Sequence, residues 1–157
     1  MTPELLTPSR APLSIGDAVA AIILVEGDGY LMQLRDSKPD IWYPGCWGLF
    51  GGGTEPDEAP LDALKRELFE ELELKVETAE FFARIDFDIG GLQLPKYYRS
   101  YYIVSISRAA EARLVVHEGA GKRLFRGREI LEEANVTPYD AFALFLYHAR
   151  GRLTCSA

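Results

Sequence analysis

The run Gly51-Gly52-Gly53, placed directly before a helical pattern, is the feature that most constrains how this chain folds. It follows a short apolar segment, Trp47 to Phe50, and precedes a segment with leucines at helical spacing, Pro56 to Leu72. Glycine lets the backbone turn sharply and approach a ligand closely. A strand, a glycine turn and a helix in this order predict a place where backbone amides and carbonyls face the side chains of the helix.

The helix predicted over Pro56 to Leu72 carries carboxylates beside its apolar face. At about 100° per residue with Glu67 as origin, its leucines fall between about 60° and 140°. These are Leu61, Leu64, Leu68 and Leu72. Glu67, Glu70 and Glu71 fall between about −60° and +40°, next to the leucines rather than opposite them.

Three carboxylates at these helical spacings repel one another by about 0.2–0.5 kcal/mol per pair. A hard divalent cation, Mg²⁺ or Mn²⁺, is the simplest compensation because such ions prefer oxygen ligands. A solvated acidic surface helix is the alternative that the pattern by itself leaves open.

The negative charge of the chain is concentrated in the same segment. The whole sequence has a net charge of −7. Residues 55–73 contain eight carboxylates against Lys65 and Arg66, so this segment is at −6 and the remainder at −1. A nucleic-acid-binding protein shows the opposite charge on its binding face. The charge pattern therefore argues against nucleic acid as the main partner, and an anionic small-molecule substrate needs cations to approach this segment.

The order of elements predicts one α/β (α+β) domain over residues 15–157, after an N-terminal extension of residues 1–14. The expected strands and helices are Ile15–Val25, Tyr30–Arg35, Trp47–Phe50, the helix Pro56–Leu72, Val76–Ile89, Lys96–Ser107, Leu114–His117, Arg123–Phe125, and the helices Gly127–Ala134 and Pro138–Arg150, with turns at Glu26–Gly29 and Gly90-Gly91. This mixed order is typical of an α/β/α sandwich with a mixed β-sheet.

The composition predicts a cytoplasmic protein that does not enter a membrane. The longest apolar run, Ala18–Val25, is far shorter than the roughly 20 residues that span a bilayer. The first twelve residues lack the apolar core of a secretion signal. Cys46 and Cys155 make no disulfide framework, which suits a reducing compartment.

The glycines and the acidic helix together resemble the Nudix box, the signature of the Nudix hydrolase family. Gly52 is followed after five residues by Glu58 and, after seven more, by Arg66-Glu67-Leu68-Phe69-Glu70-Glu71-Leu72-Glu73-Leu74. The family usually has glycine where Glu73 stands, and that glycine ends the helix in a left-handed conformation. We expect Glu73 to strain or lengthen the helix end without removing a metal ligand.

This resemblance implies a Nudix-type sandwich and an enzyme that hydrolyses the pyrophosphate bond of a nucleoside diphosphate linked to another group. It implies that Glu67, Glu70 and Glu71 bind a divalent metal ion, with the Gly51 carbonyl as a further ligand. Glu70 or Glu71 also takes a proton from the attacking water. The resemblance further implies that Arg66 orients the carboxylates by ion pairing and that Glu58 supports them.

Residues outside the box are expected to complete the site. The family often has a further acidic ligand, and Glu118 is the candidate, with Glu111 and Glu129 as weaker rivals. Arg35, at the end of a predicted strand, lies where family members often hold a phosphate-contacting arginine; a sheet-edge charge is the alternative.

Base recognition usually combines an aromatic ring with hydrogen bonds to the edge of the base. Tyr98 and Tyr102 share one face of a predicted strand, and Tyr97, Arg99 and Tyr101 share the other. We expect Tyr98, Tyr102 and Trp42 to contact substrate, although core packing also explains tyrosines in a strand. His148 is expected to be structural.

Two other functions remain possible at this level. One is a nucleotide sensor without catalysis, since a fold does not fix a function. The other is an isopentenyl diphosphate isomerase, which uses a cysteine and a glutamate near one metal; Cys46 is close to the glycines but lacks the flanking residues of that enzyme. The base, the leaving group and the choice between monomer and homodimer stay open.

Overall fold

The computed structural model describes residues 16–26, 29–132 and 135–153. The predicted N-terminal extension, the start of the first strand, the Gly27-Asp28 turn and the end of the helix predicted to reach Ala134 lie outside these residues. The elements are β1 (Ala18–Val25), β2 (Gly29–Leu34), β3 (Trp47–Gly48), α1 (Pro60–Leu72), β4 (Glu80–Phe87), η1 (Gly90–Leu92), β5 (Tyr97–Ile106), α2 (Arg108–Glu111), β6 (Gly121–Arg126), α3 (Gly127–Glu132) and α4 (Pro138–Leu153).

The strands form one mixed sheet in the order β3-β2-β1-β5-β4, with β6 paired to β2. Strands β1 and β5 run parallel, with Ala18 opposite Arg99, and the other pairs are antiparallel. The parallel pair joins segments about eighty residues apart and therefore brings the start of β1 beside the start of β5. The predicted mixed sheet is confirmed.

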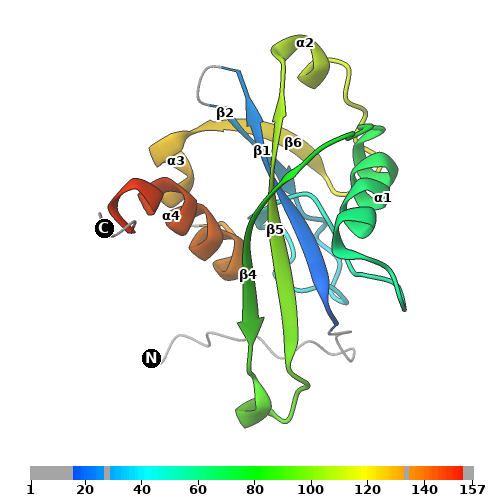
Figure 1. Cartoon of the computed structure of the whole chain (residues 1–157), viewed down its shortest axis with the longest axis vertical. Helices are drawn as coiled ribbons and strands as arrows, with labels where there is room; N and C mark the ends of the chain where they lie inside the picture. Colours follow the sequence, from blue (N-terminus) through cyan, green and yellow to red (C-terminus); the bar gives the residue numbers. More distant parts are fainter. Residues whose placement is uncertain (1–15, 27–28, 133–134, 154–157) are drawn as a thin grey trace.

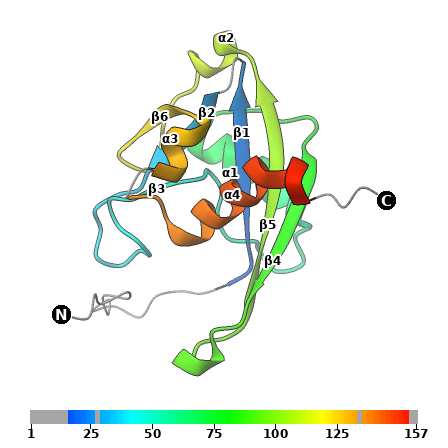
Figure 2. The same ribbon diagram turned by 90° about the vertical axis from the view of Figure 1, so that its left-hand side faces the viewer.

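Helices cover both faces of this sheet, so the predicted α/β/α sandwich is confirmed (Figures 1 and 2). Alternate residues of β1 belong to two cores: Val19, Ala21 and Ile23 pack with the leucines of α1. Ala20 and Ile22 pack with α3 and α4 on the other side. Because both faces of β1 are buried, its sequence is apolar without alternation. No helix within the described residues is long and apolar enough to cross a membrane.

The glycine segment leaves β2 and runs along β1. Strand β3 pairs with β2 for only two residues, and Phe50 and Gly53 then form isolated bridges to Ala21 and Ala18. The Phe50 and Gly52 carbonyls accept backbone hydrogen bonds of 2.9 Å from Ala21 and Val19. The glycines are therefore held beside the central strand and under α1.

Several predicted bounds were wrong for identifiable reasons. Helix α1 begins at Pro60 rather than Pro56, because Asp57 has a positive φ of 62° and Pro60 suits the first helical turn. Strand β4 is shorter at both ends than Val76–Ile89 and is followed by a 3₁₀ turn. The short helix α2 was not predicted.

The segment Leu114–His117 is not a strand. It lies against α1, where the backbone N–H of His117 donates a 2.9 Å hydrogen bond to the carbonyl of Glu71. Leu114 and Val116 pack on the core that lies between β1 and α1. Leu114 and Val116 thus face the core, but the segment does not pair with a strand among the described residues.

Candidate active site

Glu71 is the buried centre of the acidic helix. Its side chain is only 3% exposed, although it is a carboxylate. Oε2 accepts a 2.8 Å hydrogen bond from the backbone N–H of Gly51, and Oε1 accepts one of 3.1 Å from Nε2 of Gln33. Burial raises the pKa of Glu71 to about 8, and the nearby charge of Glu118 acts in the same direction. The hydrogen bonds from Gly51 and Gln33 only partly offset this increase in pKa. Without a cation, Glu71 is therefore mostly protonated at neutral pH.

Two of the glycines are required by close contacts. Gly51 has a φ of 136°, and a Cβ there would lie 2.3 Å from the carbonyl oxygen of Val19. A Cβ on Gly52 would lie 2.5 Å from the carboxylate of Glu67. The loop therefore touches α1 with its backbone, as the glycine run predicted.

Arg66 connects the remaining acidic groups of the helix. Nε and Nη2 donate to the two oxygens of Glu58 at 2.8 and 2.9 Å, and Nη2 also donates to the Gly53 carbonyl at 2.9 Å. Nη1 donates to Glu67 at 2.8 Å and to Glu70 at 3.4 Å. The Arg66 hydrogen bonds lower the pKa of Glu58 to about 2. The structure thus brings Glu58, Arg66, Glu67 and Glu70 into one contact network.

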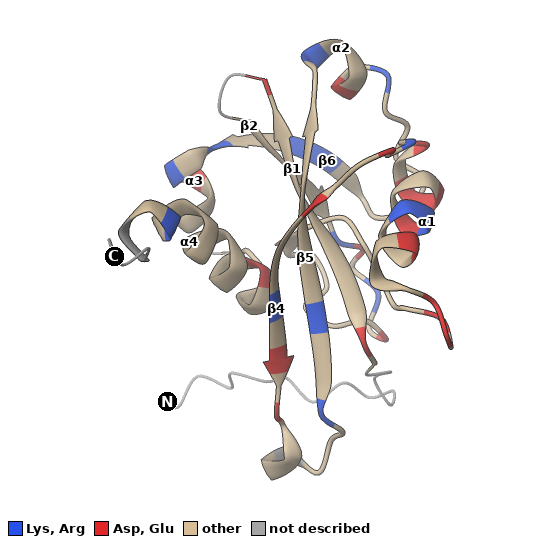
Figure 3. Cartoon of the chain, in the orientation of Figure 1, with Lys and Arg blue, Asp and Glu red and all other residues tan. Residues whose placement is uncertain are grey.

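Burial raises the pKa of Glu67 despite its contact with Arg66. Glu70, in contrast, has a side chain that is 58% exposed. The three carboxylates therefore differ in access to water: Glu71 is buried, Glu67 lies under the glycine loop, and Glu70 faces solvent. Figure 3 shows the acidic residues gathered on α1.

Glu118 lies at the same site as the helix carboxylates. Its charge contributes to the raised pKa of both Glu67 and Glu71, and its backbone carbonyl accepts a 3.1 Å hydrogen bond from Gln33. The rival acids lie elsewhere in the fold. Glu111 is paired with Lys122, and Glu129 accepts a 2.8 Å hydrogen bond from the backbone N–H of Arg126. Gln33, which links Glu71 to Glu118, was missed because nothing in its local sequence marks it.

The donor chemistry of this cluster fits a hard divalent cation. Its ligands are carboxylate oxygens, and a cation beside Glu71 would favour the charged form that burial now disfavours. Within residues 16–26, 29–132 and 135–153, no group of Asp, Glu, His or Cys side chains could hold a metal ion as it stands. Nη1 of Arg66 donates hydrogen bonds to both Glu67 and Glu70 and so holds these two carboxylates next to each other. The Gly51 N–H donates to Glu71, and the Gly51 carbonyl as a metal ligand stays a prediction.

A cavity of about 430 Å³ opens beside the glycine loop. It is lined by Gly16, Asp17, Ala18, Arg35, Trp42, Gly51, Gly52, Gly53, Thr54, Tyr97, Arg99, Glu118 and Tyr139. Arg35 and Trp42, both predicted to contact substrate, lie here together, and Nε of Arg35 donates a 2.9 Å hydrogen bond to the Trp42 carbonyl. One cavity therefore joins Glu118 and the glycine loop to an aromatic wall.

The predicted substrate contacts of Tyr98 and Tyr102 do not fit this cavity. Neither is among the lining residues, and Tyr102 is 8% exposed and packs in the core under α1, edge-on to Phe81. The opposite face of β5 supplies Tyr97 and Arg99 instead. The period-two pattern separated these two faces correctly, but only the pairing of β5 between β1 and β4 determined which one meets the site.

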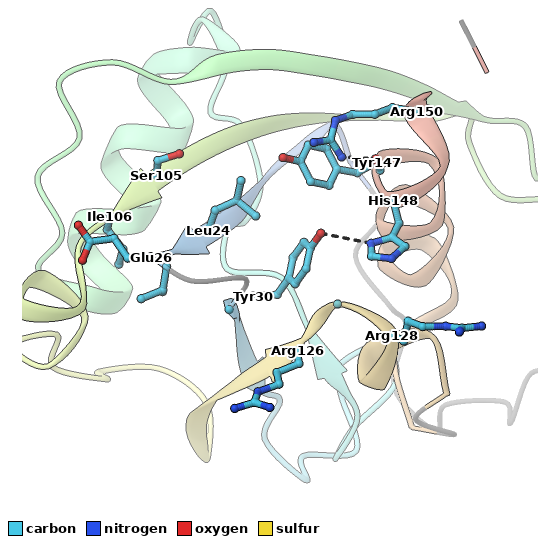
Figure 4. Close-up of a pocket in the computed structure, with 13 residues that line it drawn as sticks. Leu24, Glu26, Tyr30, Ser105, Ile106, Arg126, Arg128, Tyr147, His148 and Arg150 are labelled. Atoms are coloured by element: carbon cyan, nitrogen blue, oxygen red, sulfur yellow. Dashed lines mark hydrogen bonds between the residues drawn. The ribbon is translucent and has the colours of Figure 1, made fainter. Parts of the chain in front are cut away.

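A second, larger cavity of about 780 Å³ lies at the other end of the sheet (Figure 4). Tyr30, Tyr147 and His148 form part of its wall, and the Tyr30 hydroxyl lies 3.4 Å from Nδ1 of His148. Arg126 and Arg128 extend away from its centre in Figure 4. None of the predicted catalytic, substrate or metal residues lines this cavity. The larger cavity therefore lies apart from the residues of the candidate site.

The chain is similar in sequence to two nucleotide hydrolases. The chain is 43% identical over 49 residues to the nucleoside triphosphatase NudI of Salmonella agona, which covers 31% of this chain and 35% of that protein. It is 39% identical over 75 residues to the CTP pyrophosphohydrolase of Escherichia coli K12, covering 48% and 53%. The matched segments thus span about a third to a half of these relatives.

The whole fold matches solved structures at low sequence identity. The crystal structure of the MutT protein from Methanosarcina mazei Go1 superposes with a TM-score of 0.70 at 19% identity, over 90% of this chain and all of that one. At this identity the likeness establishes the fold alone. A family model described as the NUDIX domain matches residues 15–120, which contain the glycine loop, α1 and Glu118. The chain therefore belongs to the Nudix family.

Proposed function

We propose that this protein hydrolyses the pyrophosphate bond of a nucleoside diphosphate derivative with the aid of Mg²⁺, for which Mn²⁺ can substitute. The observation that carries the proposal is the buried carboxylate of Glu71, bonded to the Gly51 amide and surrounded by further carboxylates. Burying a carboxylate without a cationic partner lowers the stability of a fold, so stability alone does not explain the position of Glu71. The two relatives named above act, by their names, on nucleotides, and this supports the substrate class.

Each residue has a defined part in this proposal. Glu67, Glu70, Glu71 and Glu118 hold the metal, which when bound neutralises phosphate oxygens and acidifies water. Arg66 orients Glu67 and Glu70, and Glu58 fixes Arg66 through two hydrogen bonds. Arg35, which lines the cavity and donates from Nε to the Trp42 carbonyl, binds a phosphate oxygen. Glu70, which is open to solvent, takes the proton from the attacking water at a carboxylate oxygen.

The alternative functions receive less support. Cys46 is not among the described residues that line the 430 Å³ cavity, so it lacks the position that an isomerase cysteine requires. A sensor without catalysis has no need for a complete set of acidic positions, and this chain retains all of them. Neither alternative is favoured by an observation of its own.

A substrate panel tests the proposal. The purified protein is incubated with the four common nucleoside triphosphates, nucleotide sugars and ADP-ribose in Mg²⁺, and the products are separated by anion-exchange chromatography. We expect a nucleoside monophosphate as one product, and no turnover in excess chelator. Treatment with a thiol-alkylating reagent should leave hydrolysis intact, whereas it should abolish an isomerase activity that depends on Cys46.

Replacement of Glu70 by glutamine gives the decisive variant. It keeps the size of the side chain but removes its charge, and we expect kcat to fall by about two to four orders of magnitude. The exposed Glu77→Gln variant is the matched control and should keep wild-type activity. A folded Glu70→Gln protein with the wild-type rate would refute the role of Glu70, and absence of hydrolysis across the panel would refute the proposed function.

A further inference from the structure

Gln33 is a buried polar residue between the two parts of the chain that carry the candidate metal ligands. It lies near the end of β2 and is only 5% exposed. Its side chain lies on the same face of the strand as Leu31, which packs with the leucines of α1. Burying an amide at such a position is unfavourable unless its N–H groups have partners. The partners of Gln33 therefore indicate what this residue does.

One nitrogen atom of Gln33 joins α1 to the segment that carries Glu118. Nε2 donates a 3.1 Å hydrogen bond to Oε1 of Glu71 and another of 3.1 Å to the backbone carbonyl of Glu118. An amide NH₂ group has two hydrogen atoms, so these two bonds use its full donor capacity. A carbonyl oxygen can only accept, which fixes the orientation of the amide. Gln33 thus bridges two residues that lie 47 positions apart in the sequence.

The segment of residues 118–120 is held against β2 by hydrogen bonds more than by packing. Glu118 and Ala120 are exposed, and Glu118 borders a cavity of about 70 Å³ whose lining also includes Gln33 and Gly119. The backbone N–H of Ala120 donates a 2.8 Å hydrogen bond to the carbonyl of Leu34. Among the described residues, Gln33 supplies the side-chain hydrogen bond to the Glu118 backbone. Its loss would therefore free this segment on the side of Glu71.

Gly119 allows the segment to approach β2 this closely. It has a φ of 85°, and a Cβ there would lie 2.7 Å from the carbonyl oxygen of Leu34 and 3.1 Å from Nε2 of Gln33. Glycine adopts such a backbone without strain, whereas other residues do not. A side chain at this position would push the segment away from Gln33.

We propose that Gln33 is a positioning residue that holds Glu118 beside Glu71, so that both carboxylates bind one divalent cation; this inference rests on the proposed function. In this role Gln33 contacts neither substrate nor cation and acts through the Glu118 backbone and Oε1 of Glu71. Each oxygen of Glu71 accepts one hydrogen bond in the structure, which leaves a lone pair for a cation. Loss of a residue that orients ligands lowers metal affinity by about 10–100-fold.

Mn²⁺ binding tests this role without turnover. The dissociation constant of Mn²⁺ is measured at pH 8, without substrate, from the electron paramagnetic resonance signal of the free ion. Gln33→Met keeps the length of the side chain but has no hydrogen to donate, and we expect its Kd to be at least about 10-fold above that of wild type. Gln93→Met is the matched control and should keep the wild-type Kd, because Gln93 is exposed at the end of η1.

A double-mutant cycle with Glu118→Gln distinguishes positioning from other effects of Gln33. In the wild-type background this change removes a ligand charge, and we expect Kd to rise by about 10-fold or more. In the Gln33→Met background Glu118 is no longer held in place, so the same change should raise Kd by less than about 3-fold. If Gln33 affected only the charge of Glu71 or the stability of the fold, the two increases would multiply.

Gly119→Ala disturbs the same contact from the exposed side and so does not depend on a substitution in the core. We expect its Kd for Mn²⁺ to rise by about 10-fold or more, with little further rise when Gln33→Met is added. Gly91→Ala is the matched control, since a Cβ on Gly91 meets nothing within 4 Å. If Gln33→Met does not fold, the Kd of Gly119→Ala decides the proposal.

The outcomes separate this role from the proposed function. Multiplying effects in the cycle, or a wild-type Kd in folded Gln33→Met or Gly119→Ala, would overturn the positioning role even if the substrate panel shows hydrolysis. A wild-type protein that binds no Mn²⁺ would overturn it as well. If no substrate is hydrolysed, but Mn²⁺ binding depends on Gln33 through Glu118, the proposed function fails and the positioning role stands.

Discussion

The backbone N–H of Gly51 donates a 2.8 Å hydrogen bond to Oε2 of Glu71, joining the glycine loop to the buried face of α1. This contact stabilises the charged form of a carboxylate whose burial favours the protonated form. The pKa of Glu71 remains raised to about 8, so the charge of this group depends on pH and on the presence of a cation.

Stability without metal should therefore fall as pH rises. The pKa of Glu71 goes from 4.5 to about 8 on folding. Between these pH values the folded protein binds one more proton than the unfolded chain, so the free energy of unfolding decreases as pH rises from 4.5 to about 8. Glu71→Gln stays neutral, and we expect its Tm to exceed that of wild type by at least about 3 °C at pH 8.5 but not at pH 5. Scanning calorimetry in chelator, with Glu77→Gln as control, measures this. Parallel Tm–pH curves for wild type and Glu71→Gln would contradict the raised pKa.

Magnesium should stabilise the protein, and more so at higher pH. Binding to the folded state alone raises stability by RT ln(1 + [Mg²⁺]/Kd), and ligation by Glu71 requires loss of its proton. We expect Tm to rise with millimolar Mg²⁺ at pH 8 and to rise less at pH 6. The measurement is thermal unfolding against chelator at matched ionic strength. No Mg²⁺-dependent shift at either pH, or an equal shift in Glu71→Gln, would argue against Glu71 as a ligand.

Arg66→Lys should weaken metal binding rather than only destabilise the fold. Lysine cannot donate simultaneously to both Glu58 oxygens, Glu67 and the Gly53 carbonyl, as Arg66 does. We expect the Mg²⁺ concentration for half-maximal activity to rise by about 10-fold or more, the effect of losing a group that orients ligands. Arg84→Lys, which alters an exposed pair with Asp86, is the control. An unchanged Mg²⁺ requirement would leave Arg66 with a structural role only.

Replacement of Glu73 tests whether a residue other than glycine strains the backbone at the end of α1. The helix ends at Leu72 as a glycine would end it, because Glu73 adopts a φ of 54° and Leu74 donates back to Leu68. The helix is therefore not lengthened. The Glu73 carboxylate lies 2.7 Å from Nε2 of His117.

We expect Glu73→Gly to have a Tm about 2–4 °C above Glu73→Ala, since both lose the exposed contact but only alanine keeps the unfavourable left-handed backbone. Thermal unfolding at pH 7 measures the difference. Equal Tm values for the two variants would show that the helix end carries no backbone strain.

Much of the fold was predictable because its signals are local. The leucine spacing of α1, the glycine run and the apolar β1 each reflect forces that act within a few residues, and these predictions of architecture hold. Predictions that depended on neighbours in space were less secure. Leu114–His117 was predicted as a strand but lies beside α1, and Tyr102 lies in the core while Tyr97 lines the cavity.

The sequence by itself determined the acidic helix, the glycine loop and their contact, because a helix period and a sharp turn are set by consecutive residues. Only the tertiary structure decided what completes the site. The parallel pairing of β1 and β5 places Arg99 beside Ala18, and the start of α4 brings Asp140 and Tyr139 to it. Gln33 likewise reaches Glu71 only through the fold. Such contacts join residues dozens of positions apart, and their identities depend on sheet order and register, which no local pattern encodes.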